Sequence, residues 1–208
     1  MLWLEAETAD GVVGLGETFY AAEAVEAYIH ANLAPIVLGM SAVDIEAVYY
    51  RTRPYVGFVA ASTELRARSA LDIALWDALG KVTGQPISVL LGGRIRSQIP
   101  VYNTCAGNQY VRGTKLGTTE NFGISSSGTD QNYEDLDRFL NDPVGLAGSL
   151  LDMGIDSMKI WPFDFAAEAT QGQFISPAEL NKALAPFEAI KKEYGDRMQI
   201  SAELHGMW

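Results

Sequence analysis

The protein has 208 residues, 48% of them hydrophobic and 20% charged, which is typical of a globular chain with one or two domains. Its formal net charge of −11 argues against nucleic acid or an anionic membrane as a partner, although a bound divalent cation can still make an anionic substrate acceptable. One cysteine, no basic leader and no apolar run of ~18 residues predict a cytoplasmic protein without an internal disulfide or a membrane span.

The first fifty residues predict a β-hairpin followed by two helices. Weakly alternating residues flank Asp10 and Gly11, a turn pair that is typical of hairpins. Pro35 is expected to close the first helix, because proline is poorly tolerated in a helix interior. The expected elements are strands over 2–7 and 12–17 and helices over 21–33 and 43–52.

Residues 53–58 form a loop that carries aromatic side chains between Pro54 and Gly57. Aromatic residues in such a loop either cover a binding pocket or pack back into the core, and both alternatives are open here. We take Tyr55 from this loop as a candidate substrate-binding residue.

The strongest helix prediction covers residues 64–81. Apolar side chains recur there at helical spacing, and Gly84 and Pro86 end the pattern. Arg66 and Arg68 lie outside the apolar face. The residues expected to face the core are Leu65, Ala70, Leu71, Ala74, Leu75, Ala78 and Leu79.

From residue 97 onward, short apolar runs alternate with helical patterns, an order typical of parallel strand–helix units. Residues 107–142 interrupt this order, because they are rich in Gly, Ser, Thr and Asn and have little periodicity. Such a long insertion indicates a functional or mobile segment. The expected elements are strands over 99–104, 156–161 and 198–203 and helices over 143–153 and 178–194.

Polar side chains follow the last expected strand at its carboxyl end. If the strand continues through them, Glu203 and His205 share one face with Ser201, and Leu204 lies on the other. A carboxylate and an imidazole placed in this way can reach one ligand, although a solvated strand end is the simpler interpretation of so short a motif. Asn103 has a comparable place at the end of the strand over 99–104.

A longer pattern resembles a known family. The resemblance is to the mandelate racemase/muconate lactonizing branch of the enolase superfamily, and it extends over essentially the whole chain. The segments that carry it are SALDIALWDALGK at 69–81, GQP at 84–86 and LLGG at 90–93, together with the hairpin residues TADG at 8–11 and GE at 16–17.

This resemblance implies an α+β capping domain over residues 1–96, followed over 97–208 by part of an α/β domain, a modified TIM-like barrel. Strands near Val101, Lys159 and Glu203 are expected to be neighbours in that order, and active sites of such barrels lie at the carboxyl ends of the strands. Since a complete barrel takes ~250 residues, the chain is expected to be a fragment that lacks the later strands and the first strand of the cap.

The resemblance also implies roles for residues at these strand ends. Glu203 takes the place of a carboxylate that binds Mg²⁺, a cation that prefers oxygen ligands. Lys159 takes the first of two positions at which many relatives have lysine, and Trp161, which cannot abstract a proton, takes the second. His205 takes the place of the histidine that protonates a departing hydroxyl in acid-sugar dehydratases. The candidate site comprises catalytic His205 and Lys159, substrate-binding Tyr55, Asn103 and Trp161, and metal-binding Glu203.

The function implied by the resemblance is Mg²⁺-dependent dehydration of a sugar acid through an enediolate, most like that of galactonate dehydratase. Those relatives usually have aspartate where this chain has Glu203. A racemase, epimerase or cycloisomerase of the same family is the alternative, and a non-catalytic binding module is the alternative from another class. We expect the full-length protein to be a homo-oligomer and the 208-residue chain alone to be inactive.

Overall fold

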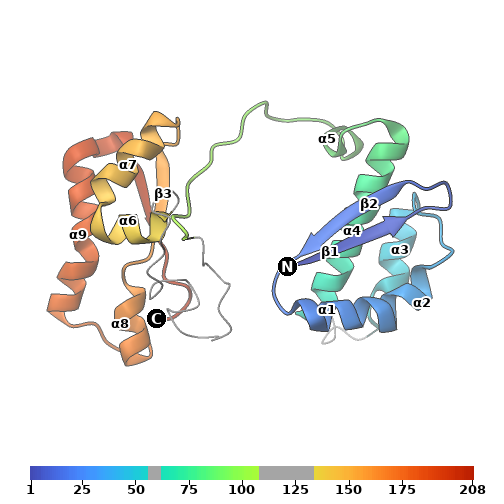
Figure 1. The fold of residues 1–208 in the computed structure, drawn as a ribbon, viewed down its shortest axis with the longest axis horizontal. Helices are drawn as coiled ribbons and strands as arrows, with labels where there is room; N and C mark the ends of the chain where they lie inside the picture. Colours follow the sequence, from blue (N-terminus) through green and yellow to red (C-terminus); the bar gives the residue numbers. More distant parts are fainter. Residues whose placement is uncertain (56–61, 108–133) are drawn as a thin grey trace. The chain divides into compact units, whose positions relative to one another are not determined.

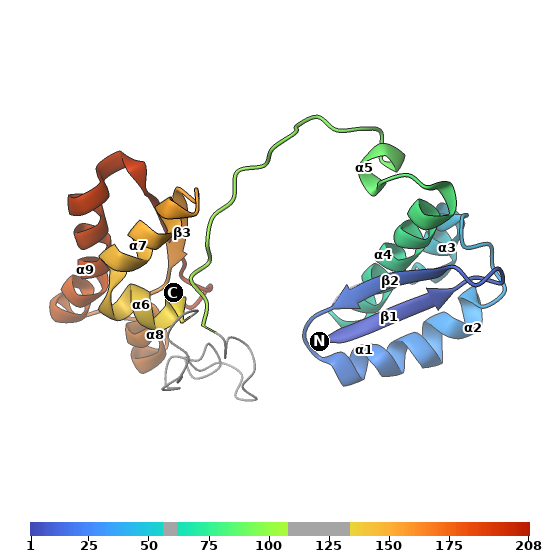
Figure 2. The same cartoon turned by 45° about the horizontal axis from the view of Figure 1, so that its top comes forward.

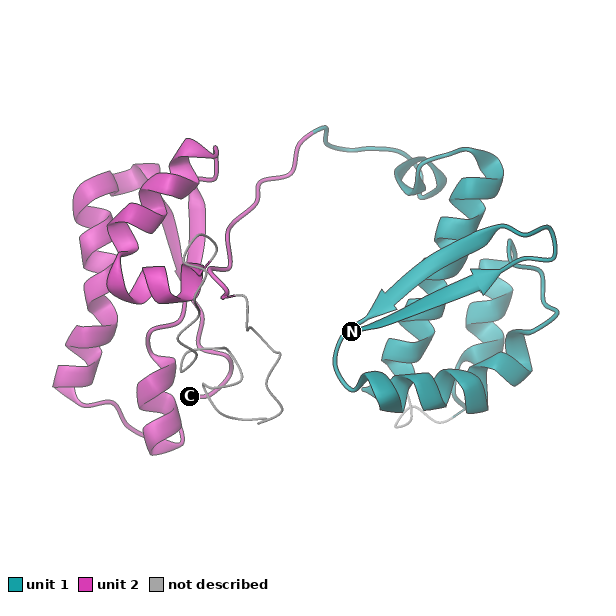
Figure 3. Ribbon diagram, viewed as in Figure 1, with its two compact units in different colours: residues 1–97 teal, residues 98–208 magenta. Residues whose placement is uncertain are grey.

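The computed structural model describes residues 1–55, 62–107 and 134–208. They form two compact units, unit 1 over Met1–Ser97 and unit 2 over Gln98–Trp208 (Figure 3). Within the described ranges, no helix is both long and apolar enough to cross a membrane.

Unit 1 contains the predicted hairpin. Strand β1 (Leu2–Glu7) pairs antiparallel with β2 (Val13–Thr18), and the hairpin packs against the long helix α4 (Thr63–Thr83) (Figures 1 and 2). Gly14 and Gly16 of β2 allow this close approach, because a Cβ atom on either residue would overlap a backbone carbonyl of α4. The hairpin prediction is confirmed, with the second strand shifted by one residue.

The remaining helices of unit 1 differ from the prediction at Pro35. The chain does not leave the helical path there, because a π-helical turn, η1, leads into another helix whose first turn contains Pro35. Proline is tolerated in a first turn, because the N–H groups there have no acceptor within the helix and the missing N–H costs no hydrogen bond. The elements are α1 (Ala22–Tyr28), η1 (Ile29–Leu33), α2 (Ala34–Val37), α3 (Ile45–Thr52) and α5 (Ile87–Leu90).

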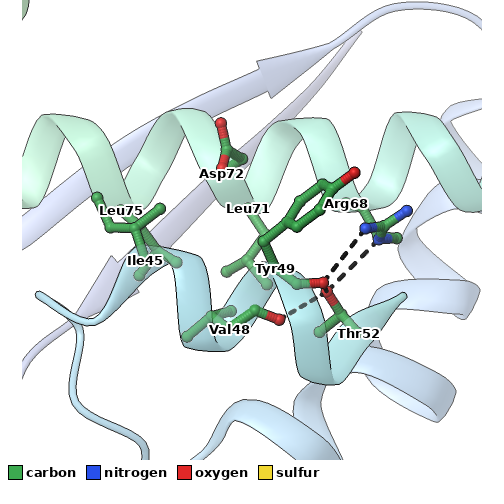
Figure 4. A pocket seen from close by; sticks show the side chains of 8 residues that line it. All are labelled: Ile45, Val48, Tyr49, Thr52, Arg68, Leu71, Asp72 and Leu75. Carbon is green, nitrogen blue, oxygen red and sulfur yellow. Dashed lines mark hydrogen bonds between the residues drawn. The ribbon is translucent and has the colours of Figure 1, made fainter. Parts of the chain in front are cut away.

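Helix α4 provides much of the core of unit 1, but two of its predicted positions are wrong. Leu65 is exposed, whereas Arg68 is buried. The guanidinium of Arg68 lies 4.7 Å above the centre of the Tyr49 ring, and it donates hydrogen bonds to the Tyr49 carbonyl at 3.3 Å and to Thr52 Oγ1 at 3.4 Å (Figure 4). A buried arginine is therefore satisfied by the carboxyl end of α3. The core consists of Val25, Leu33, Ile45, Val48, Ala67, Leu71 and Leu75.

Unit 2 contains a small parallel sheet. Strand β3 (Ser157–Ile160) pairs parallel with β4 (Gln199–Ala202), with Met158 opposite Ile200. Asn103 forms a parallel bridge to Met158 on the other side of β3, so the order is Asn103, β3, β4, as expected. The strand predicted over 99–104 is reduced to this single bridge, and Val101 is exposed.

The helices of unit 2 include two that the sequence did not predict. Helix α6 (Asp135–Asn141) lies within the segment interpreted as aperiodic, and α8 (Asp164–Thr170) follows β3. The rest of that segment, 108–133, lies outside the described residues. Helices α7 (Pro143–Asp152) and α9 (Pro177–Tyr194) pack together beside the sheet (Figure 1). A short 3₁₀ turn over Gly195–Arg197 leads from α9 towards β4. The core consists of Cys105, Leu136, Phe139, Leu146, Ala147, Leu150, Met158, Ile160, Trp161, Ile190 and Met198.

Candidate active site

Lys159 and Glu203 come together at the carboxyl edge of the small sheet. The Glu203 backbone N–H donates to the Ile160 carbonyl, which continues the ladder one residue beyond β4. Lys159 Nζ then lies 3.0 Å from Glu203 Oε2. The parallel register makes this contact possible, because the carboxyl ends of parallel strands meet at one edge.

The ion pair shifts the pKa of both groups. The hydrogen bond from Lys159 and a second one from the His205 backbone N–H lower the pKa of Glu203 to about 2. Partial burial acts in the opposite direction but has a smaller effect. Burial acts to lower the pKa of Lys159, but Glu203 and the nearby Tyr102 outweigh it and leave that pKa raised. The Lys159 ammonium lies 5.4 Å from the centre of the Tyr102 ring. Both site groups are therefore charged at neutral pH.

His205 does not continue the strand, so the prediction that it shares a strand face with Glu203 is wrong. Its φ of 48° lies in the left-handed region, and Gly206 follows with a φ of 65°. The turn is closed by Glu203, whose Oε1 accepts hydrogen bonds from the backbone N–H groups of Leu204 at 3.1 Å and His205 at 3.0 Å. Glu203 thus binds Lys159 with one oxygen and shapes the turn with the other.

Asp164 is a site residue that the sequence reasoning missed. It is the first residue of α8, its side chain is completely buried, and its Oδ2 lies 2.7 Å from His205 Nδ1. Burial raises the pKa of Asp164, although the contact with His205 acts in the opposite direction. The sequence offered one indication of a site residue, because Asp164 follows the strand expected over 156–161 by three positions. No neighbouring residue indicated that its side chain would be buried.

Trp161 forms a wall of this site. Its side chain is 1% exposed and packs between Phe139 and His205, with ring centroids 5.3 Å and 5.6 Å away in edge-to-face geometry. The Trp161 side chain therefore packs against the imidazole ring of His205 and belongs to the core of unit 2.

Asn103 lies on the opposite side of β3 from Glu203. Its side-chain oxygen accepts a hydrogen bond from the Cys105 backbone N–H at 2.6 Å, and its Nδ2 donates to Asp135 Oδ2 at 3.0 Å. The bond to Asp135 connects the residues around Asn103 with the start of α6. Cys105 itself is buried, and this burial raises the pKa of its thiol to about 12. A cysteine in this environment stays protonated.

Tyr55 belongs to unit 1, while the other predicted site residues belong to unit 2. Its side chain is fully exposed at the start of the aromatic loop, whose residues 56–58 lie outside the described ranges. Unit 1 also has a hollow of about 810 Å³ beside β1, and its lining includes none of the predicted site residues. The sequence-predicted residues that the structure brings together are therefore Lys159, Trp161, Glu203 and His205.

Glu203 fits a magnesium ion as a single ligand. A carboxylate oxygen is the donor that Mg²⁺ prefers, and this ion keeps several waters or substrate oxygens in its other positions. Across residues 1–55, 62–107 and 134–208, no group of three or more His, Cys, Asp or Glu side chains is placed to hold a metal. Among these residues Glu203 therefore offers a single carboxylate, and a complete metal site is not formed by the described part of the chain.

The geometry defines a protein with an α+β unit and a second unit in which a lysine, a glutamate and a histidine meet at the carboxyl edge of parallel strands. Residues 1–92 match the family model described as mandelate racemase/muconate lactonizing enzyme, N-terminal domain. The chain belongs to the mandelate racemase/muconate lactonizing enzyme family of the enolase superfamily.

Similar proteins extend the comparison beyond residue 92. The chain is 30% identical over 196 residues to a D-mannonate dehydratase of Novosphingobium aromaticivorans, covering 92% of this chain and 46% of that protein. It is 37% identical over 106 residues to an L-rhamnonate dehydratase of Saccharopolyspora erythraea, covering 50% of this chain and 26% of that protein. The chain spans about half the length, or less, of these relatives.

Two solved structures have a similar fold. An enolase of the mandelate racemase subgroup from Agrobacterium tumefaciens is 42% identical and superimposes with a TM-score of 0.77 over 99% of this chain and 47% of that one. An enolase protein from Sargasso Sea environmental sequencing is 40% identical, with a TM-score of 0.78 and the same coverage.

Proposed function

We propose that the full-length protein is a Mg²⁺-dependent hydro-lyase that converts a sugar acid into a 2-keto-3-deoxy acid. The observation that carries this proposal is the meeting of Lys159, Glu203 and His205 at one edge of the parallel sheet. Sequence similarity to proteins named D-mannonate dehydratase and L-rhamnonate dehydratase supports the substrate class.

In this proposal each residue has a distinct task. Glu203 is a metal ligand, and the Lys159 ammonium beside it offsets the negative charge of the substrate carboxylate. His205 donates a proton to the departing hydroxyl, a general-acid role in which histidine is the most frequent residue. Trp161 supplies an apolar wall. Asn103 and, in unit 1, Tyr55 remain proposals as substrate-binding residues.

The chemistry supplied by a bound Mg²⁺ is electrostatic stabilisation of the substrate carboxylate as its α-proton is lost. Glu203 holds one coordination position in this scheme. The remaining protein ligands and the base for the α-proton belong to parts of the full-length protein beyond these 208 residues. We assign residues 1–96 to a capping domain and 97–208 to the first three strand–helix units of a barrel.

The proposal is tested by incubating the full-length protein with a panel of sugar acids and Mg²⁺. We expect formation of a 2-keto-3-deoxy acid, detected as its semicarbazone, and loss of this product when EDTA removes the metal. Glu203→Gln should abolish turnover, while Glu188→Gln on the exposed side of α9 serves as the matched control.

The same assay separates the alternatives. A product of unchanged mass with an inverted stereocentre indicates a racemase or epimerase. When an unsaturated dicarboxylic acid replaces the sugar acid, a lactone of unchanged mass indicates a cycloisomerase. If no substrate gives turnover and none exchanges its α-proton in D₂O, the dehydratase proposal is contradicted. That outcome favours a non-catalytic relative.

A further inference from the structure

Asp164 and His205 form a buried pair that the proposed roles do not include. The two residues are 41 positions apart, yet Asp164 Oδ2 lies 2.7 Å from His205 Nδ1 because α8 begins just beyond the end of β3 and His205 lies just beyond the end of β4. The pair therefore depends on the register of the two parallel strands.

Interactions among the described residues hold both the backbone and the ring of His205. The backbone has a left-handed φ of 48°, and its N–H is bound by Glu203 Oε1. The ring lies edge-to-face with Trp161 at an interplanar angle of 78°. The contact with Asp164 distinguishes the two ring nitrogens, because Asp164 Oδ2 lies beside Nδ1.

The environment of Asp164 is costly for stability. Its side chain is 0% exposed, and its second oxygen, Oδ1, has no hydrogen-bond partner among the described residues. A buried carboxylate oxygen without a partner destabilises the fold, and so stability alone gives no reason for an acidic residue at this position. A role in orienting His205 does give a reason, since sites of this kind are maintained at a cost to stability.

We propose that Asp164 is a positioning residue that accepts a hydrogen bond from His205 Nδ1–H and directs Nε2 towards the departing hydroxyl. The imidazolium form of His205 gives its Nε2 proton to this hydroxyl, and the neutral Nδ1–H tautomer that remains is the one that Asp164 holds. The proposal rests on the role of His205 in the proposed function and adds the residue that orients it. Asp164 itself does not touch the substrate. Carboxylates that hold a histidine tautomer in this way have large effects on catalysis in other enzymes.

The first test is spectroscopic and needs no substrate. Nitrogen-15 chemical shifts of histidine rings distinguish a protonated Nδ1 from a protonated Nε2, and comparison with His205→Asn identifies the His205 signals in the full-length protein. We expect a protonated Nδ1 in the unaltered protein, with a proton that exchanges slowly with solvent. A His205 ring with an unprotonated Nδ1 would overturn the proposal, whether or not any sugar acid is a substrate.

The second test uses Asp164→Asn, with Asp152→Asn at an exposed position of α7 as the matched control. An asparagine amide can donate to Nδ1 and favour the other tautomer. We therefore expect kcat to fall about 100-fold with KM within about threefold, together with a changed His205 nitrogen spectrum. A structural role predicts instead a lower melting temperature with an unchanged spectrum and kcat.

The two measurements are interpreted together. A fall in kcat without a change in the nitrogen spectrum contradicts positioning, and so does a change in the spectrum with unchanged kcat. If Asp164→Asn does not fold, the shifts and the proton exchange of the unaltered protein decide the matter. Absence of turnover in the unaltered protein counts against the proposed function, while the nitrogen spectrum still tests the pair.

Discussion

Lys159 Nζ lies 3.0 Å from Glu203 Oε2, although the two residues are separated by 44 positions in the chain. The contact joins the ends of β3 and β4 and holds the carboxylate that we propose as a metal ligand. In the protein without metal, the lysine ammonium therefore supplies the positive charge beside this carboxylate.

The first prediction concerns pH. Glu203 has a folded-state pKa of about 2, below the value of about 4.3 for an unfolded glutamate. Its ionised side chain therefore adds fully to the free energy of unfolding above about pH 4.3, and this stabilisation is lost as the pH falls towards 2. We expect the free energy of unfolding in EDTA to decline less steeply over this window in Glu203→Gln. The difference should stay below about 1 kcal/mol, because the pair is partly exposed. Urea titrations at several pH values measure it, and parallel curves would contradict the prediction.

The second prediction concerns the two proton transfers of the proposed reaction. His205→Asn in the full-length protein should reduce dehydration by at least about 100-fold, because the departing hydroxyl loses its acid. Exchange of the substrate α-proton with D₂O should continue, since the base lies elsewhere. Proton NMR of the substrate and a keto-acid assay follow the two steps separately. Dehydration at the unaltered rate would remove His205 from the mechanism.

The third prediction concerns the close approach of β2 to α4. Gly14→Ala should destabilise unit 1 by about 2–4 kcal/mol, because the new Cβ would overlap the Ala74 carbonyl and force the hairpin away from the helix. Thermal unfolding measures the loss. Gly11→Asn is the control, since the turn has open space there and asparagine tolerates its φ of +80°. Equal effects of the two substitutions would argue against the close contact.

The fourth prediction concerns the buried arginine of unit 1. Arg68→Lys should lower the free energy of unfolding by about 1–3 kcal/mol, because lysine cannot stack on Tyr49 while reaching both oxygen acceptors at the end of α3. Arg51→Lys, at an exposed position of α3, is the matched control and should have little effect. An unchanged urea midpoint for Arg68→Lys would show that the stacking and hydrogen bonds do not stabilise the unit.

Features that depend on local spacing could be predicted from the sequence. The turn at Asp10 and Gly11 specifies the hairpin, and the apolar spacing between residues 64 and 81 specifies α4. The alternation of strands and helices after residue 97 indicated parallel pairing, which places Lys159 and Glu203 at one edge of the sheet. These features follow from the periodicity of neighbouring residues along the chain.

Other features were decided only by tertiary structure. The burial of Arg68 depends on the end of α3, and the pairing of Asp164 with His205 depends on the register between β3 and β4. Their physical basis is the same, because a charged side chain becomes stable in a buried position only when a partner distant in sequence is brought within hydrogen-bonding distance. Spacing along the chain does not encode that distance.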